Sequence, residues 1–188
     1  MSDPLLVVDV QRGFINEFTH HIPARVVQLL RSGEYDPVLV TRFVNVPDGP
    51  YWRFLDWQEC AGPPQTDLAP ELAPYVSADR IFSKAGLCGL PAELATYLRE
   101  HGLERVFIVG IDTDMCVLKI AMDLFDLGIE PIVITDCCAS TAGLQAHLAG
   151  LAVLARNIGA GRLREAGLSD GAMAAPPAPD DVDGAPRS

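Results

Sequence analysis

The feature that most constrains the fold is an alternation of short apolar runs with segments of helical periodicity. The apolar runs are rich in β-branched residues and show no polar alternation, which is typical of strands buried on both faces. Such strands belong in a parallel sheet that helices cover on both sides. The sequence therefore predicts an α/β fold, doubly wound around a mostly parallel sheet. The strand segments are residues 4–10, 36–44, 79–84, 104–111 and 130–137.

The segments between the predicted strands carry helix signals. Two of them end at a glycine, Gly33 or Gly102, the residue type found most often just past a helix end. Residues 45–66 differ, because they hold four prolines, two glycines and both tryptophans. They predict a long loop, with one helical turn at most, of a kind that is often functional. Helices are expected over residues 24–33, 91–102 and 143–159 and directly after residue 111.

The length of 188 residues indicates one domain. We place it at residues 1–168. From about Gly171 the composition turns to alanine, proline, aspartate and glycine, which cannot bury a core. Residues 169–188 are therefore predicted to be a disordered tail.

Charge and cysteine content limit the partners and the compartment. The net charge of −11 argues against nucleic acid and anionic membranes, which need a basic face. No apolar run reaches the roughly 18 residues of a membrane span, and the start, "MSDPLLVVDVQ", lacks the basic region of a signal peptide. Five cysteines, an odd number without an export signal, favour a reducing cytoplasm. No cysteine spacing suggests a metal site, and we expect no cofactor.

Three chemically useful side chains follow the predicted strands. Asp9 ends the first strand, Lys84 ends the third, and Cys116 begins the helix after the fourth. Taken singly, each has a plain explanation: a turn former, a solvated charge and a small buried residue. Carboxyl ends of parallel strands meet at one edge of the sheet, where ligands of such folds bind. The three together predict a catalytic site.

A cysteine at a helix start can act as a nucleophile. The unpaired N–H groups and the partial positive charge of a helix N-terminus stabilise a thiolate, and a nearby Lys84 would add to this effect. We therefore expect a lowered pKa for Cys116. The same N–H groups can hold the oxyanion of a tetrahedral intermediate, and Asp9 can accept the thiol proton and later activate water.

Three blocks of this sequence resemble the signature blocks of isochorismatase-like cysteine hydrolases. They are "VVDVQRGF" (7–14), "FSKAG" (82–86) and "GIDTDMCV" (110–117), and the resemblance covers most of residues 4 to 165. It implies a six-stranded sheet in the order 3-2-1-4-5-6. It also implies a catalytic triad, which falls on Asp9, Lys84 and Cys116.

The resemblance implies details around the cysteine. A non-proline cis peptide bond is expected between Ile111 and Asp112, with the N–H groups of Asp112 and Cys116 as oxyanion donors. The family commonly has a small residue at position 112, so the aspartate is a departure. It could shape the substrate pocket, or its charge could oppose formation of the thiolate.

The branch within the family follows from residues that are present or absent. Isochorismatases proper lack the cysteine, whereas nicotinamidases carry a metal-binding Asp-x-His after strand two; here those positions are Phe43 and Asn45. The chain therefore resembles the amide-cleaving branch without that metal site, acting on a small amide, carbamoyl or ureido compound. Hydrolysis of an ester, thioester or vinyl ether, and a non-catalytic binding role, remain as alternatives.

Aromatic side chains are the candidates for substrate contact. Phe14 follows the Asp9 block and matches a pocket position of the family. Trp52 and Trp57 lie in the 45–66 loop and could close over substrate or fill a subunit interface. By resemblance we expect a homo-oligomer, a dimer or a tetramer.

Other polar positions are assigned structural roles. His147 lies in an apolar helix and is expected to be packed and hydrogen-bonded. Asp136 ends the fifth strand and is expected to anchor a loop or a neighbouring helix start. Cys137 and Cys138 are expected to be core residues, and Cys88 is the one other cysteine near the predicted cleft.

Overall fold

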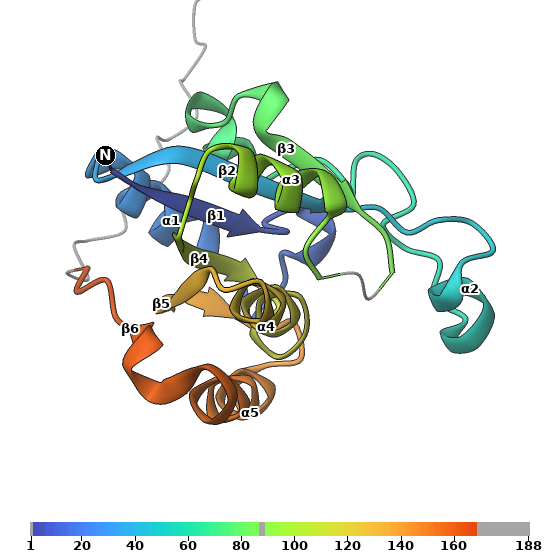
Figure 1. Cartoon of the computed structure of the whole chain (residues 1–188). Helices are drawn as coiled ribbons and strands as arrows, with labels where there is room; N and C mark the ends of the chain where they lie inside the picture. Colours follow the sequence, from blue (N-terminus) through green and yellow to red (C-terminus); the bar gives the residue numbers. More distant parts are fainter. Residues whose placement is uncertain (1, 87–88, 169–188) are drawn as a thin grey trace, which may run out of the picture.

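A single six-stranded sheet organises the molecule (Figure 1). The computed structural model describes residues 2–86 and 89–168, so the predicted disordered tail and Cys88 lie outside the described residues. All neighbouring strands pair in parallel, in the order β3-β2-β1-β4-β5-β6. This confirms the predicted fold class and strand order. The strands are β1 Asp3–Val8, β2 Tyr35–Phe43, β3 Ile81–Lys84, β4 Arg105–Ile111, β5 Glu130–Ala139 and β6 Leu163–Arg164.

Helices cover the sheet on both faces (Figure 1). The α-helices are α1 Ile22–Arg31, α2 Pro50–Leu55, α3 Ala92–Glu100, α4 Leu118–Asp126 and α5 Leu144–Leu154. A π-helical turn, Thr113–Val117, leads directly into α4, and a second, Ala155–Gly159, continues α5. Short 3-10 turns are Arg12–Phe14, Pro70–Tyr75, Ala78–Arg80 and Ala160–Arg162.

The alternation of side chains along β1 explains the two layers. Leu5 and Val7 point into a core shared with α1 and the turn at residues 70–75. Leu6 and Val8 point into a second core shared with α3, α4 and α5. All four side chains are fully buried, which is why the strand reads as uninterrupted apolar sequence.

The structure differs from the predicted elements at several boundaries. The third strand starts at Ile81 rather than residue 79, because Ala78–Arg80 form a 3-10 turn. The long fifth helix ends as an α-helix at Leu154. The two-residue strand β6 has no pattern of its own, and only the family resemblance anticipated a sixth strand. Within the 45–66 loop, α2 is the expected helical turn.

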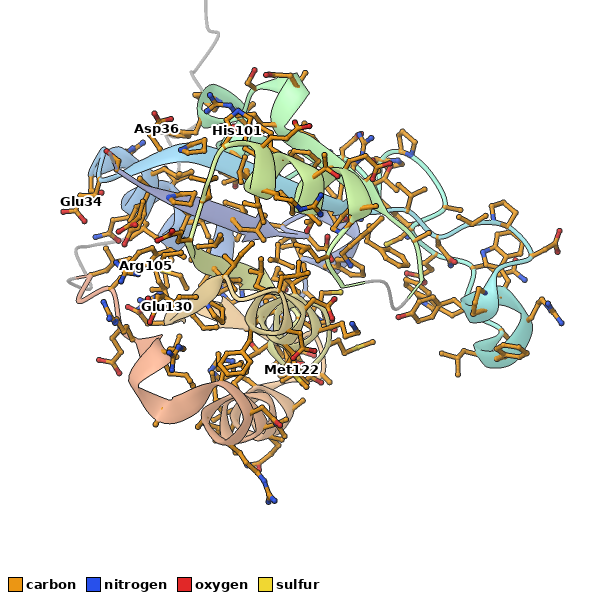
Figure 2. All side chains as sticks on the ribbon, viewed as in Figure 1. Glu34, Asp36, His101, Arg105, Met122 and Glu130 are labelled. Carbon is orange, nitrogen blue, oxygen red and sulfur yellow. The ribbon has the colours of Figure 1, made fainter. Side chains whose placement is uncertain are left out.

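The two ends of the sheet have different chemistry. The strands start at an edge that carries charged side chains, among them the exposed Glu34 and Arg105 and the partly exposed Glu130 (Figure 2). There Arg105 pairs with Glu130 at 2.7 Å from Nε to Oε2. The strands end at the opposite edge, beyond which α2 lies (Figure 1). Among the described residues, no helix is both long and apolar enough to cross a membrane.

Candidate active site

Strand register brings the ends of β1, β2 and β4 together. Val8 pairs with Thr41 on one side and with Gly110 on the other. A Cβ at Gly110 would lie 2.1 Å from the Val8 carbonyl oxygen, and the residue has a φ of +126°. Only glycine allows so close an approach of the two strands. The central strands therefore deliver their last residues to one small region.

Asp9 occupies the position just after β1 and is turned into the protein. Its φ is +49°, a left-handed conformation that costs free energy for any residue with a Cβ. Its N–H donates to the Thr41 carbonyl at 3.2 Å, and its side chain is completely buried. The Thr41 hydroxyl donates to Asp9 Oδ1 at 2.8 Å. The carboxylate is therefore fixed in place by β2.

Lys84 links the other two predicted catalytic residues. It ends β3 opposite Phe43, and its side chain is 1% exposed. Its Nζ lies 2.8 Å from Asp9 Oδ2 and donates to Cys116 Sγ at 3.2 Å. The three residues expected from strand ends are thus in direct contact around one ammonium.

The buried charges set the protonation of this cluster. Burial alone would lower the pKa of Lys84, but the Asp9 carboxylate and Cys116 more than reverse that and raise it, so the ammonium persists. Burial raises the pKa of Cys116, Asp9 raises it further, and Lys84 opposes both. The net direction for Cys116 is upward. The expected lowering of its pKa is wrong, because burial and the Asp9 carboxylate outweigh Lys84.

Cys116 lies in the π-helical turn, and the peptide bond between Ile111 and Asp112 is cis. The Asp112 carbonyl accepts the N–H groups of Met115 and Val117, which closes the turn. Helix α5 packs tightly on this turn, since a Cβ at Gly150 would lie 2.8 Å from Asp114 Cα. The turn is therefore fixed by its own hydrogen bonds and by its packing against α5.

Asp112 points its carboxylate toward Thr141, in the segment after β5. One oxygen accepts the Thr141 N–H, and the other accepts the Thr141 hydroxyl at 3.0 Å. Burial raises the pKa of Asp112 to about 6, although the Thr141 bonds oppose the rise. The unusual aspartate is thus a buried acid, four residues before Cys116, whose pKa lies well above its ordinary value.

A cavity of about 440 Å³ opens at this point, and we call it the triad cavity. Cys116 is the triad member on its wall, and Phe14 and Trp57 line it as the sequence suggested. Trp52, expected to share their role, is not among the described residues that line it. The other lining residues are Gly13, Asn16, Phe43, Tyr51, Leu55, Glu59, Asp112, Met115 and Thr141.

Two residues that sequence reasoning missed support the site. Gln11 is buried and bonds both the N–H and the carbonyl of Phe43, tying the segment after β1 to the end of β2. A polar residue directly after an apolar strand was the available signal. Tyr51 lines the cavity from α2. Burial, and then Cys116, raise the pKa of its hydroxyl, so the phenol stays protonated as a hydrogen-bond donor.

The positions of the nicotinamidase metal motif hold no metal ligands here. Phe43 has no ligand atom. The Asn45 amide donates to the carbonyl oxygens of Trp57 and Glu59, at 3.0 and 2.9 Å, and so holds the 45–66 loop. Within residues 2–86 and 89–168, no group of three or more histidine, cysteine, aspartate or glutamate side chains could bind a metal ion.

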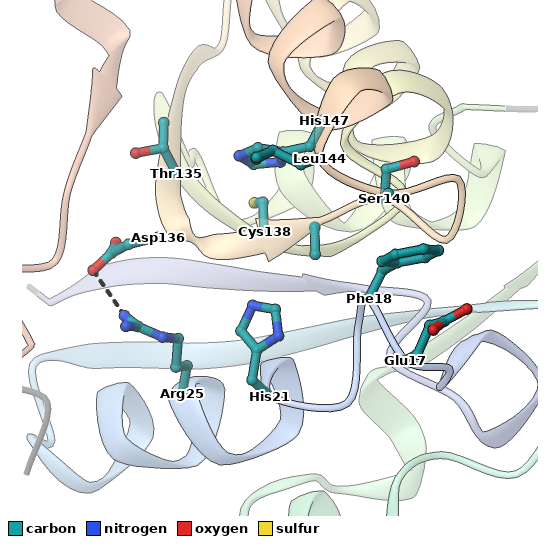
Figure 3. A pocket seen from close by; sticks show the side chains of 12 residues that line it. Glu17, Phe18, His21, Arg25, Thr135, Asp136, Cys138, Ser140, Leu144 and His147 are labelled. Atoms are coloured by element: carbon teal, nitrogen blue, oxygen red, sulfur yellow. Dashed lines mark hydrogen bonds and ion pairs between the residues drawn. The ribbon is translucent and has the colours of Figure 1, made fainter.

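A second cavity, of about 470 Å³, lies between α1, the end of β5 and α5 (Figure 3). We call it the histidine cavity, because His21, the N-cap residue of α1, and His147 of α5 line it. His147 is hydrogen-bonded to the Thr113 hydroxyl at 2.8 Å, as the packed role predicted. Asp136 pairs with Arg25 at 3.4 Å and accepts the Ala166 N–H, which confirms its anchoring role. Burial raises the pKa of Cys138 on this wall, as expected of a core cysteine.

Two proteins with similar sequences are nicotinamidases. A nicotinamidase/pyrazinamidase of Mycobacterium tuberculosis is 28% identical over 167 residues, which cover 76% of this chain and 87% of that protein. A nicotinamidase of Acinetobacter baylyi is 49% identical over 64 residues, but this match spans only 34% of the chain and 26% of that protein.

Solved structures share the fold. An isochorismatase-like hydrolase of Alkaliphilus metalliredigens superposes with a TM-score of 0.74 at 22% identity, over 88% of this chain and 95% of that one. An N-carbamoylsarcosine amidase of Thermoplasma acidophilum gives 0.70 at 24% identity, over 91% and 100%. The family model for the isochorismatase domain matches residues 4–162. The chain therefore belongs to the isochorismatase family of hydrolases.

Proposed function

We propose that this protein hydrolyses a C–N bond of a small amide, carbamoyl or ureido compound, with Cys116 as the nucleophile. The observation that carries the proposal is the contact of one buried ammonium, Lys84, with both the Asp9 carboxylate and the Cys116 sulfur. A cation at this point can stabilise an anion on either partner. That is the requirement for moving a proton between them.

Because the pKa of Cys116 is raised, the resting state has a thiol beside the Asp9 carboxylate. When substrate binds, Asp9 takes the thiol proton while the sulfur attacks the carbonyl carbon. Lys84 stays protonated and offsets the charge as it moves from carboxylate to sulfur. A buried base in contact with the ammonium thus replaces the pre-formed thiolate that the helix start alone would suggest.

The attack places negative charge on the former carbonyl oxygen. We assign its stabilisation to the N–H groups of Asp112 and Cys116, at the start of the turn that runs into α4. N–H groups of a first helical turn lack intrahelical partners and point toward that start. Donors fixed before the reaction stabilise a developing oxyanion without reorganisation.

The remaining steps return the site to its starting state. The C–N bond breaks as Asp9 gives its proton to the leaving nitrogen, which leaves an acyl group on Cys116 through a C–S bond. Asp9 then removes a proton from water, and the hydroxide attacks the acyl carbon. The C–S bond breaks, the acid leaves, and the proton on Asp9 returns to the sulfur. No redox partner is needed at any step.

A substrate panel tests this proposal. Ammonia or amine release should be measured with primary amides, carbamoyl compounds and ureido compounds, beside matched esters, thioesters and a vinyl ether. We expect C–N cleavage by the wild type, no cleavage by Cys116→Ala, and full activity in Cys138→Ala, whose sulfur lies in the other cavity. Cleavage of the esters or the vinyl ether alone, or activity that survives Cys116→Ala, would contradict the proposal.

A further inference from the structure

One wall of the triad cavity is aromatic. The ring of Phe43 lies 5.7 Å from that of Phe14, 5.6 Å from that of Tyr51 and 5.9 Å from that of Trp57, between centroids. Tyr51 and Trp57 are themselves 5.2 Å apart. These four residues come from three separate segments and form one continuous cluster on the cavity. The faces of such rings attract cations as well as apolar groups.

The same cavity carries two carboxylates. Asp112 lines the cavity together with Cys116, and each of its carboxylate oxygens accepts one hydrogen bond from Thr141. A carboxylate oxygen has two lone pairs, so both oxygens keep capacity for a further donor. Glu59 is exposed and lines the cavity from the 45–66 loop. Within residues 2–86 and 89–168, neither carboxylate forms an ion pair with a lysine or arginine.

No cationic side chain balances these acids at the cavity wall. Among the described lining residues there is no lysine or arginine. Lys84 lies behind the wall, 1% exposed, with its ammonium on Asp9 and Cys116. An anionic substrate would therefore meet two carboxylates and no free counter-charge, an arrangement that costs binding free energy. The net charge of −11 acts in the same direction at longer range.

We infer that the substrate is a small amide that carries a cationic group, such as an alkylammonium, a few bonds from the carbonyl that Cys116 attacks. This rests on the proposed function and specifies its substrate class. The aromatic cluster contacts the apolar surface of the cation, and Asp112 and Glu59 supply the opposite charge. A cavity of about 440 Å³ is at the small end of the range for small-molecule sites, which suits a short substrate.

Three amides of equal length separate charge from shape. They are 4-(trimethylammonio)butanamide, its carbon isostere 5,5-dimethylhexanamide, and 4-carbamoylbutanoate. We expect kcat/KM, from ammonia release, to be at least about tenfold higher for the ammonium than for its isostere, and lowest for the carboxylate. Equal values for the ammonium and its isostere, or a preference for the carboxylate, would overturn the inference.

A binding measurement keeps this inference separate from the proposed chemistry. The Kd of each compound for the Cys116→Ser variant should be measured by calorimetry, with the same order expected. If no amide is hydrolysed by the wild type but the ammonium binds at least about tenfold tighter than its isostere, the proposed function fails and the cation preference stands. If the ammonium binds no tighter, the cation preference fails whatever the turnover.

Variants assign the preference to residues. The ratio of ammonium to isostere kcat/KM, or of Kd where turnover is lost, is taken within each variant, so that a general loss cancels. We expect Asp112→Asn to reduce the ratio severalfold and the exposed Glu59→Gln to reduce it less. Glu93→Gln, which removes an exposed charge on α3, is the matched control and should leave it unchanged. A ratio that stays constant in both Asp112→Asn and Glu59→Gln would overturn the assignment.

Discussion

The triad cavity and the histidine cavity have similar volumes and contain similar kinds of residue. Each has a cysteine, Cys116 or Cys138, and an ion pair nearby. The pair behind the triad cavity, Lys84 with Asp9, is almost wholly buried at 2.8 Å and touches the sulfur. The pair at the histidine cavity, Arg25 with Asp136, is 29% and 22% exposed at 3.4 Å.

The difference shows what makes a buried cysteine useful. Burial raises the pKa of both thiols. Cys116 has an ammonium at 3.2 Å to stabilise its anion, whereas the Cys138 thiol donates to the Ile108 carbonyl oxygen at 4.0 Å, and a hydrogen bond from the Gly110 backbone only partly offsets its burial. A carbonyl oxygen opposes ionisation of a thiol. The cation and base in contact with the sulfur, rather than the presence of a cavity, therefore mark the reactive position.

The largest expected difference in activity is between substitutions of the two cysteines. Cys116→Ala removes the nucleophile and should lower kcat/KM for the best amide by about a thousandfold or more. Cys138→Ala removes a buried sulfur of the same kind and should leave kcat/KM within about twofold, with some loss of stability from the small cavity. Steady-state ammonia release from both variants checks the comparison. Comparable losses of kcat/KM in the two variants would contradict the assignment of Cys116 as the reactive cysteine.

The second largest expected difference is in stability, between variants that break the two ion pairs. Lys84→Met leaves Asp9 buried without its partner and should cost about 3–5 kcal/mol of unfolding free energy, with loss of activity. Arg25→Met breaks a half-solvated pair and should cost about 0–1 kcal/mol. Urea unfolding followed by tryptophan fluorescence measures both. If Arg25→Met were the more damaging, the ranking of the two pairs by burial would be wrong.

Asp112, on the wall of the triad cavity, should make the unfolding free energy of the protein depend on pH. Its pKa in the folded protein, about 6, is above the ordinary 3.8, so the folded state binds a proton more tightly than the unfolded state. The contribution is favourable below about pH 4 and is lost as pH rises through 6, by roughly 2–3 kcal/mol. The charged or titratable groups that bear on it are Asp114, Asp9 and the Tyr51 hydroxyl.

The Asp112→Asn variant isolates this effect. Its unfolding free energy minus that of the wild type should increase by roughly 2–3 kcal/mol between pH 4 and pH 8, because the variant has no carboxylate to ionise. Denaturant midpoints at four pH values measure the trend. A difference that is constant with pH would mean that Asp112 titrates normally.

The smallest expected effects come from two threonine hydroxyls. Thr41 donates to Asp9 Oδ1 at 2.8 Å in the core, whereas Thr135 donates to the Arg164 carbonyl at 3.2 Å in an exposed position. Thr41→Val should lower kcat about tenfold with little change in KM. The substitution removes a hydrogen bond that holds the base, Asp9, and removes no contact with substrate. Thr41→Ser should restore most of the loss, and Thr135→Val should have no effect. A change in KM alone would indicate a different role for Thr41.

The sequence predicted the parts of the site that depend on strand ends. Asp9 and Lys84 could be placed because parallel strands finish at one edge, and Cys116 because it follows β4 at a helix start. Gln11 and Tyr51 could not be placed in the same way. Their roles depend on how the segment after β1 and the 45–66 loop fold back on β2, and apolar periodicity carries no information about that.

The direction of the Cys116 pKa shift could not be predicted from the sequence, for a related reason. The helix start and Lys84 were visible and both lower it. The burial of the sulfur and its closeness to Asp9 raise it more, and both depend on the packed structure. Asp112 was recognised as unusual, but its two bonds to Thr141 join segments 29 residues apart.

The most direct test of the covalent role of Cys116 is the mass of the protein during turnover. The wild type is mixed with the most rapidly hydrolysed amide, quenched with acid within milliseconds and digested for peptide mapping, with a parallel reaction in hydroxylamine. We expect the acyl group on the Cys116 peptide, or its capture as a hydroxamate where deacylation is fast, and neither in Cys116→Ala. Turnover that continues with unmodified Cys116 and without hydroxamate, or an acyl group on another residue, would contradict the account.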